Sequence, residues 1–464
     1  MKTGRTLSRR NLLRLSGLAA FSLGAAACGG ATPAPAGSGG QAAAATSAAS
    51  PAAATGEKTT VRWQDWPDWE PNLDKIMARI EQDLPHLNVE FETLGDGFED
   101  KTLAAMVAGT APDVTTGWGP IFRVWAEKGQ LLDLQPFVDR DFTAERIADF
   151  HEFQWNGMVA KDSGIRFAVP FYVNLIMLYY NKEAFDEAGV PYPTADMDHD
   201  DYAQMLMATT KVEDGKVVRW GGSITPSSYD RFQVHVQAYG GHVVNPDDWT
   251  ECWLGKDEAL EALEWMRARL WDDNSIAQPM QLQGIGQATG TQAGPWAARM
   301  LATEEGGMGA VAFYATESPF EFALTHIPEG PARRSTLGTT DGYAIYKGSK
   351  NIEGAWDLLK FLTDDFFQGM VTETWGGIPA RLSLLPNWKD TIIKSFPTLE
   401  NANMDAILEA LEWGYPMTTE EFKVHSESQS VIEAALQKVF EVGDTPVDYF
   451  IQVADEVTKI NREG

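Results

Sequence analysis

The alternation of short apolar runs with amphipathic runs near the start of the folded region constrains the fold more than any other feature. Two amphipathic runs repeat apolar residues every three to four positions, as helices do. Pro71 is expected to open the first and Pro85 to end it, and the second begins at Phe98, with Gly109 as its C-cap. Three runs around them have the composition of strands: residues 59–64, 89–93 and 113–117. This βαβαβ order predicts a right-handed parallel sheet with helices on its faces.

Length and charge bound the remaining possibilities. A chain of 464 residues is too long for one hydrophobic core, because single cores stop growing at about 250–300 residues. At least two lobes are therefore expected, and an apolar fraction of 44% is ample to fill them. A formal net charge of -29 without basic stripes excludes a nucleic-acid partner, since phosphate binding needs clustered Lys and Arg.

The first 28 residues have the organisation of an export signal. Arg9 and Arg10 precede an apolar run over residues 15–27, which is too short to span a membrane and ends in small residues before Cys28. The paired arginines resemble a twin-arginine signal. The Ala-Ala-Ala-Cys sequence at 25–28 resembles the lipobox of bacterial lipoproteins, although Ala25 departs from the usual Leu. This resemblance implies a lipid anchor on Cys28.

The segment that follows predicts a tether. Residues 29–57 consist almost entirely of Ala, Pro, Gly, Ser and Thr, which cannot bury a core, and we expect them to be disordered. If Cys28 is lipidated, Cys252 is the only thiol left and no intramolecular disulfide can form. We interpret Cys252 as a packed small residue rather than a nucleophile.

Two tryptophan groups fall at one edge of the predicted sheet. The DWPDW sequence, with Trp66 and Asp68, follows the first strand, and Trp118 follows the third. In open α/β sheets ligands bind beyond the carboxyl ends of the strands, so both groups reach the same edge. Indole faces interleaved with carboxylates suit a carbohydrate, which has apolar faces and hydroxyl rims. The alternative is that these rings only fill the edge of the sheet.

Residues 167–185 are predicted to form a second segment of the chain that reaches the same site. An apolar run is broken by Pro170, continues through Tyr172 and Asn174, and resumes as a second apolar run over residues 175–180. Because proline is tolerated only at strand ends or crossings, we read one extended segment entering a site and another leaving it.

Metal and catalytic motifs are absent from the sequence. The acidic group at residues 196–201 is better explained by Asp198 as an N-cap than by a metal site, since calcium loops need a longer fixed spacing. His151 and Glu152 begin a zinc-protease pattern, but Trp155 stands where its second His should be. No HExxH, P-loop or GxSxG sequence occurs. We expect no metal, no cofactor and no catalytic residues.

The rest of the chain predicts further elements and the start of the last helix. The aromatic end of one predicted strand places Tyr314 at a strand terminus, and Thr445 and Pro446 are expected to cap and open the final helix. The other expectations are strands at 220–224 and 306–314, helices at 257–270, 352–362 and 431–440, a loop at 281–296, a strand after residues 340–343, and a turn-rich segment at 375–381.

Three blocks carry a resemblance to a known family. They are FEDKTLAAMVAGTAPDVTTGW with WAEKGQLLDL within residues 97–134, PFYVNLIMLYYNKEAFDEAGVPYPT at 170–194, and the PEGP, DGYAIYKGSKNIEGAWDLLKFLT and GGIPAR sequences within 328–381. These blocks resemble the extracellular solute-binding proteins of bacterial carbohydrate ABC importers, and the resemblance covers nearly all of the chain after the tether.

The resemblance implies an α/β, two-lobe periplasmic-binding-protein-like fold of type II with a ligand cleft between the lobes. Lobe 1 would comprise residues 58–169 and 337–385, and lobe 2 residues 170–336 and 386–464. Together with the signal and the lipobox, the resemblance implies an exported monomer that would be anchored by lipid to the outer face of the cytoplasmic membrane. It would bind a carbohydrate, close around it and deliver it to the transmembrane permease subunits, without breaking a bond.

The same resemblance, together with the aromatic edge, implies a set of ligand-binding residues. Trp66, Trp118, Tyr172 and Trp375 would offer flat faces to a sugar, while Asp68, Asn174 and Asp341 would hydrogen-bond its hydroxyls. Arg381, in the Pro-Ala-Arg sequence, would hold ring or hydroxyl oxygens with its guanidinium. Tyr229 and Tyr314 are the candidates from the second lobe.

Two other functions stay open on the sequence alone. A secreted carbohydrate-active enzyme would need two facing carboxylates, for which Asp65 with Asp341 is the available pair. A binding protein for a non-sugar solute, such as glycerol phosphate or a glycerophosphodiester, would want several Lys or Arg at the cleft, and the candidate loops offer only Arg381.

Overall fold

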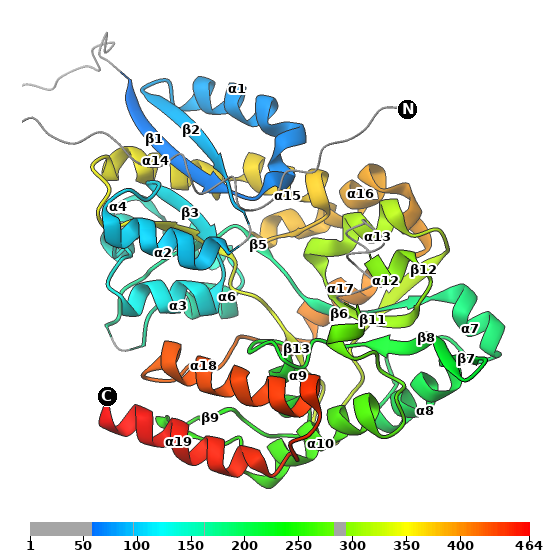
Figure 1. The fold of residues 1–464 in the computed structure, drawn as a ribbon. Helices are drawn as coiled ribbons and strands as arrows, with labels where there is room; N and C mark the ends of the chain where they lie inside the picture. Colours follow the sequence, from blue (N-terminus) through cyan, green and yellow to red (C-terminus); the bar gives the residue numbers. More distant parts are fainter. Residues whose placement is uncertain (1–57, 96, 162, 283–293) are drawn as a thin grey trace, which may run out of the picture. The chain divides into compact units, whose positions relative to one another are not determined.

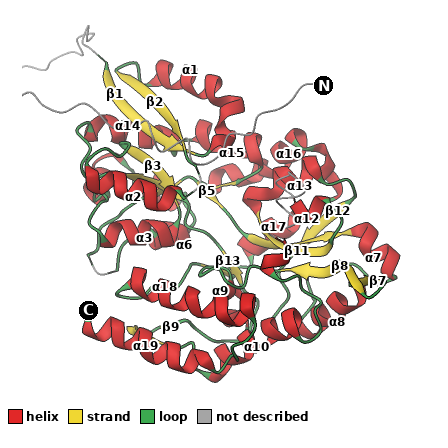
Figure 2. Ribbon diagram, in the orientation of Figure 1, coloured by secondary structure: helices red, strands yellow, loops and turns green. Residues whose placement is uncertain are grey.

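The computed structural model describes residues 58–95, 97–161, 163–282 and 294–464 (Figure 1). The predicted signal, Cys28 and the predicted tether lie outside these residues, as does most of the loop expected at 281–296. Residues Thr55–Gly464 form one compact unit, in which helices cover two five-stranded sheets (Figure 2).

The first sheet contains the predicted βαβαβ unit. Helices α1 (Leu73–Asp83) and α2 (Phe98–Ala108) join three mutually parallel strands, and Gly109 caps α2 with a left-handed φ of 77°. The predicted parallel pairing of these three strands is confirmed, and two further strands extend the sheet, of which β14 runs antiparallel to β3. In spatial order the strands are β2 (Leu87–Thr93), β1 (Thr59–Asp65), β3 (Val114–Gly117), β14 (Gly342–Ile345) and β4 (Val169–Pro170).

The loop after β1 is more ordered than the sequence predicts. Residues Pro67–Asn72 form a 3-10 helix, and Pro71 lies inside it instead of opening α1. The helix begins at Leu73 and ends before Pro85, and it buries Ile76 and Ile80 against the sheet.

The second sheet contains the correction with the largest consequence for the site. A strand was predicted over residues 306–314, but β11 ends at Gly307 and the chain continues as a 3-10 turn (Met308–Ala310) and helix α13 (Val311–Glu317). Gly306 and Gly307, at the end of β11, lie in crowded surroundings. A Cβ on Gly306, for example, would lie 2.9 Å from the Tyr314 hydroxyl. In spatial order the strands are β12 (Phe322–Thr325), β6 (Ile176–Asn181), β11 (Leu301–Gly307), β8 (Lys216–Ser223) and β7 (Lys211–Glu213).

Two extended segments connect the sheets. From β4 in the first sheet the chain passes through β5 (Tyr172–Val173) into β6 of the second, so extended segments flank Pro170 as the sequence predicts. The return segment runs through β13 (Thr336–Leu337) into β14. Gln154 of α6 (Glu152–Gly157) holds the two together, because its Nε2 donates to the carbonyls of Tyr172 (2.8 Å) and Thr339 (2.7 Å).

The remaining helices surround the sheets. The predicted helix at 352–362 is confirmed as α14, but the last helix, α19, begins at Tyr449, because Pro446 and Val447 form a turn before it. The others are α3 (Gly119–Glu127), α4 (Gln135–Asp141), α5 (Ala144–Ala148), α7 (Lys182–Ala188), α8 (His199–Thr209), α9 (Phe232–Ala238), α10 (Asp257–Trp271), α12 (Gly294–Ala297), α15 (Asp365–Trp375), α16 (Leu385–Ser395), α17 (Asp405–Glu412) and α18 (His425–Leu436).

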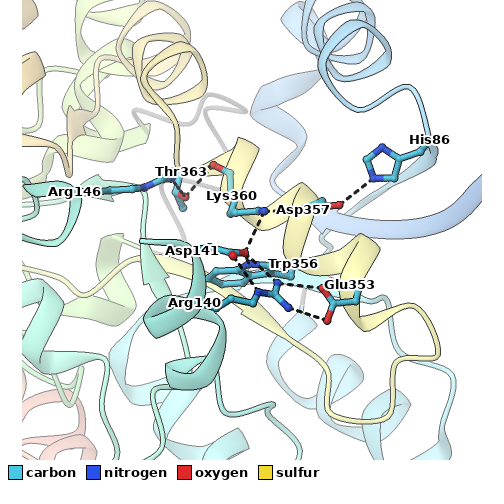
Figure 3. Close-up of polar contacts among 9 residues, drawn as sticks. All are labelled: His86, Arg140, Asp141, Arg146, Glu353, Trp356, Asp357, Lys360 and Thr363. Carbon is cyan, nitrogen blue, oxygen red and sulfur yellow. Dashed lines mark hydrogen bonds and ion pairs between the residues drawn. The ribbon is translucent and has the colours of Figure 1, made fainter. Parts of the chain in front are cut away.

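An ion-pair network fixes α14 to α4 on the side of the first sheet (Figure 3). The carboxylate of Asp141 accepts hydrogen bonds from Trp356 Nε1 (2.6 Å), Lys360 Nζ (3.3 Å) and Arg140, whose guanidinium also reaches Glu353 (3.1 Å). These five residues are the Asp141 network. The Arg140 hydrogen bond holds the pKa of Asp141 well below its usual range.

Hydropathy adds one observation. Among the helices of the described residues, none combines the length and the apolar composition needed to cross a bilayer.

Candidate functional site

A cavity of ≈ 460 Å³ lies where the strand ends and the two connecting segments meet. Its walls come from the ends of β1 and β3, from β5, from the loop after β8, from the end of β11 and from the loop before β14. Six of the ten predicted ligand-binding residues line it: Trp66, Trp118, Tyr172, Asn174, Tyr314 and Asp341. We call it the inner cavity.

Two indole rings form one wall of the inner cavity. Trp66 and Trp118 follow the parallel strands β1 and β3 directly, so the register of the sheet brings them together. Their ring centroids lie 6.0 Å apart at an interplanar angle of 23°, and Phe98 meets Trp66 edge-on at 5.1 Å. Both indoles are only partly buried, which leaves aromatic surface for a ligand.

A buried carboxylate lies close to these rings. Asp341 accepts hydrogen bonds from the hydroxyls of Thr339 and Tyr172, and only 5% of its surface is exposed. Burial raises the pKa of Asp341 to about 8. The same burial, with the nearby Asp341, raises the pKa of Tyr172 well above its ordinary value, so Tyr172 keeps its proton.

A second carboxylate of this kind comes from β11. Burial raises the pKa of Glu304 to about 7, and the hydroxyl of Tyr314 on α13 donates a hydrogen bond to it. Tyr314 is held in place by Tyr179, whose ring centroid lies 4.5 Å away. Both residues therefore present a hydrogen-bonding group from the second sheet.

Three charged residues complete the lining. Asp230 and Arg231 follow β8, and the positive charge of Arg231 opposes the rise in the pKa of both Glu304 and Asp341. Glu305 is 7% exposed; one of its oxygens contacts His235 Nε2 at 3.1 Å, and its Oε1 has no hydrogen-bond partner among the described residues.

An adjoining cavity of ≈ 320 Å³ extends the site between α2, α3 and α18. It shares Trp118, Ser228 and Asp230 with the inner cavity, and we call it the outer cavity. Tyr229 lines this space, and its hydroxyl donates to the carbonyl of Glu420 (2.9 Å).

Three predicted ligand-binding residues lie elsewhere. Trp375 is 6% exposed and packs in the core, with its ring 4.3 Å from Trp69. The guanidinium of Arg381 is held by Asp149 (2.5 Å) and Asp365 (2.5 Å), beside a separate hollow of the surface. Asp68 is partly buried in the 3-10 helix after β1 and does not line the inner cavity.

The charged lining residues that sequence reasoning missed are Asp230, Arg231, Glu304 and Glu305. The signal for the first pair was present, since a polar segment follows the predicted strand at 220–224 just as Trp118 follows β3. The second pair was hidden by the wrong placement of β11, because the predicted strand began at Gly306, just after both glutamates.

The two carboxylates of the enzyme alternative, Asp65 and Asp341, do not line the inner cavity together. Asp65 is fully buried, accepts from Trp63 Nε1 (3.1 Å), the Trp66 amide (2.8 Å) and Tyr343, and does not line the inner cavity. Within the described part of the chain, no three His, Cys, Asp or Glu side chains are grouped to hold a metal ion.

Two local predictions are confirmed. Asp198 caps α8 by accepting from the Asp201 amide at 2.8 Å. Cys252 is packed in the core, where burial raises the pKa of its thiol to about 12.

Comparison with known proteins places this geometry in a family. The family described as "Bacterial extracellular solute-binding protein" matches residues 65–365. A candidate binding protein of Brucella abortus (strain 2308) is 23% identical over 321 residues, which is 67% of this chain and 72% of that one.

Solved structures share the fold. An ABC substrate-binding protein from Listeria monocytogenes in complex with cycloalternan has a TM-score of 0.72 at 21% identity, covering 87% of this chain and 99% of that chain. UgpB from Mycobacterium tuberculosis in complex with glycerophosphocholine has a TM-score of 0.71 at 18% identity, covering 88% of this chain and 99% of that chain. The fold is therefore the two-lobe α/β fold of periplasmic binding proteins of type II.

Proposed function

Because the chain belongs to the bacterial extracellular solute-binding protein family, we propose that it captures a carbohydrate outside the cell and delivers it to the permease of an ABC importer. The observation that carries the proposal is the inner cavity, whose lining combines two stacked indoles with the carboxylates of Asp341 and Glu304. The neighbour that binds cycloalternan supports the carbohydrate class.

The chemistry of the inner cavity suits a polyhydroxylated ring. Trp66 and Trp118 offer apolar faces to the C–H surface of a sugar, and Asp341, Glu304 and Arg231 offer acceptors and donors to its hydroxyls. A hydrogen bond to a charged group contributes about 1.5–3 kcal/mol. Two or three of these with stacked rings reach the roughly 8 kcal/mol of micromolar binding.

Closure around the ligand follows from where the walls originate. Trp66 and Trp118 belong to the first sheet, whereas Glu304 and Tyr314 belong to the second sheet and its adjoining helix. A ligand that touches both favours the closed arrangement by its differential affinity. The lobes we propose are residues 58–169 with 337–385 and residues 170–336 with 386–464.

A contact between α3 and α18 supports closure. The carboxylate of Glu127 on α3 accepts from the amides of His425 (2.6 Å) and Ser426 (3.3 Å) at the start of α18. Charge-assisted bonds to a helix N-terminus are favourable, so this contact holds the two sides of the outer cavity together.

The permease subunits, the export route and the lipid anchor belong to the same proposal. The twin-arginine-like sequence, the lipobox and Cys28 support an exported monomer anchored on the outer face of the cytoplasmic membrane. We infer that the protein is not an enzyme, because binding and release complete its task, and incubation with glycans should yield no product.

Glycerophosphocholine is the second candidate ligand, because the neighbour that binds it has a comparable TM-score. The inner cavity is unfavourable for the phosphate of glycerophosphocholine, because Arg231 is the only Lys or Arg among the described lining residues. A thermal-shift screen with mono- and oligosaccharides and glycerophosphocholine distinguishes the two, because a ligand of the native state raises the melting temperature. A shift with glycerophosphocholine and with no saccharide would overturn the carbohydrate proposal.

Two tryptophans test the site itself. Trp118→Ala should abolish the shift given by the best saccharide while changing the melting temperature of the free protein little, because its indole is only partly buried. Trp375→Ala is the matched control: loss of a core indole should lower stability by about 3–5 kcal/mol. A large loss of stability in Trp118→Ala would show that this ring, too, belongs to the core.

A further inference from the structure

The two adjoining cavities are acidic well beyond the average of the chain. The inner cavity is lined by Asp230, Glu304, Glu305 and Asp341, and the outer cavity adds Glu99, Asp100 and Glu433. Against these carboxylates stands Arg231, the only basic side chain among the described lining residues. The whole chain holds 66 acidic and 37 basic residues, a ratio below two to one.

The inner carboxylates take their hydrogen bonds mainly from uncharged groups. Ser228 donates to Asp230, Tyr314 to Glu304, and Thr339 and Tyr172 to Asp341. Buried carboxylates are costly to ionise unless a positive charge approaches them. The site therefore has acceptor capacity that its own side chains do not satisfy, and an approaching cation would stabilise the ionised, negative form of these carboxylates.

Glu305 supplies an independent sign of a missing partner. Its side chain is 7% exposed, His235 contacts one oxygen at 3.1 Å, and the other oxygen, Oε1, is buried without a partner among the described residues. A buried acceptor without a donor is destabilising, so such atoms usually have a role. Glu305 lines the inner cavity, so its unpartnered acceptor lies in the wall of the site.

We propose that the site selects a saccharide that carries a free ammonium group, an amino sugar with an unmodified primary amine, over the neutral and anionic sugars of the same shape. This inference rests on the proposed carbohydrate-binding function. An ammonium donates up to three charged hydrogen bonds to the carboxylates and is attracted to the faces of Trp66 and Trp118. An anionic sugar such as a uronate or a phosphate would instead oppose the ionisation of these carboxylates.

The test uses sugars that differ at one group. Glucosamine, galactosamine and mannosamine are each compared by calorimetry with the neutral parent and the N-acetyl derivative, as are the β-1,4-linked disaccharides of glucosamine, N-acetylglucosamine and glucose. At least one free amine should bind about tenfold or more tightly than its neutral parent, and added salt should reduce the difference.

Isosteric variants test the assigned groups. Glu305→Gln and Glu304→Gln should each reduce the preference for the amine about tenfold and change the affinity for the neutral parent less. Glu353→Gln, on the exposed side of α14, is the matched control and should leave the preference unchanged.

Two outcomes overturn different statements. If neutral sugars bind and no amine exceeds its parent, the ammonium inference is wrong and the carbohydrate proposal stands. If no saccharide of the panel or of the wider screen binds, the carbohydrate proposal itself fails.

Discussion

The Asp141 network and the inner cavity hold the same chemical group in opposite electrostatic settings. In the network, Asp141 is surrounded by Arg140, Lys360 and the indole N–H of Trp356, and its pKa falls below the usual range (Figure 3). In the inner cavity, burial outweighs the hydroxyl donors and raises the pKa of Asp341 to about 8 and of Glu304 to about 7.

The difference separates structural carboxylates from those available to a ligand. Asp141 already has charged partners from α4 and α14, so its bonds fix one helix to another. Asp341 and Glu304 lie in a cavity and accept hydrogen bonds from uncharged groups, so a ligand that donates to them replaces missing hydration. The expected result is that one group controls stability and the other controls affinity.

Ligand affinity should show the largest contrast. At about pH 9, where the Asp341 carboxylate with its pKa of about 8 is ionised, Asp341→Asn is expected to weaken binding of the best saccharide about 10–100-fold, because a hydrogen bond to a charged group contributes about 1.5–3 kcal/mol. Asp141→Asn should leave that affinity unchanged, since its carboxylate lies outside both cavities. Calorimetric titration of the two variants side by side measures the contrast, and equal losses would remove the distinction.

The pH dependence of stability should separate the two regions next. A carboxyl whose folded pKa is raised stabilises the fold below its unfolded pKa of about 4, and this contribution is lost as pH rises through the folded value. Unfolding free energy of the ligand-free protein should therefore fall between about pH 4 and 9, as Glu304, Asp341 and the buried Asp65, with a pKa of about 7, ionise.

The variants give this pH profile its control. In the double variant Glu304→Gln with Asp341→Asn, the unfolding free energy should fall less steeply as pH rises. The fall that remains should be the contribution of Asp65. Asp141 behaves in the opposite sense: its lowered pKa stabilises the fold above about pH 4, and this contribution is lost in acid. Asp141→Asn should thus change the acid limb of a chemical-denaturation series and leave the alkaline limb intact.

Local patterns predicted the first sheet well. Strand composition and helix periodicity located β1, β2, β3, α1 and α2, and terminators such as Pro85 and Gly109 marked where the two helices end. The rule that ligands bind beyond the carboxyl ends of parallel strands then placed Trp66 and Trp118 at the same edge, without any knowledge of contacts.

The rest of the site depends on pairing between distant segments, which local patterns do not encode. The Gly306 to Tyr314 run is apolar enough for a strand or a helix, and only packing of the two glycines against Tyr179 and Asn174 decides where β11 ends. For the same reason sequence reasoning assigned Trp375 and Arg381 to the ligand, whereas Trp69 and Asp149 hold them elsewhere.

The smallest expected effect concerns the network alone. Asp141→Asn should lower the unfolding free energy by about 1 kcal/mol, because ion pairs near the surface contribute little and salt screens them. The side chain of Glu353 is 69% exposed, so Glu353→Gln should lower the unfolding free energy by only a few tenths of that amount. Urea denaturation with and without about 1 M salt, where charges act over about 3 Å, measures both.

An equal loss of stability in Asp341→Asn and Asp141→Asn would contradict the contrast between the inner cavity and the Asp141 network. If removing the charge of Asp341 lowered the stability of the ligand-free protein at pH 8 as much as Asp141→Asn does, its carboxylate would be a structural partner. The expected sign is the reverse: a neutral amide in that buried position avoids the cost of ionisation, so stability at alkaline pH should be unchanged or higher.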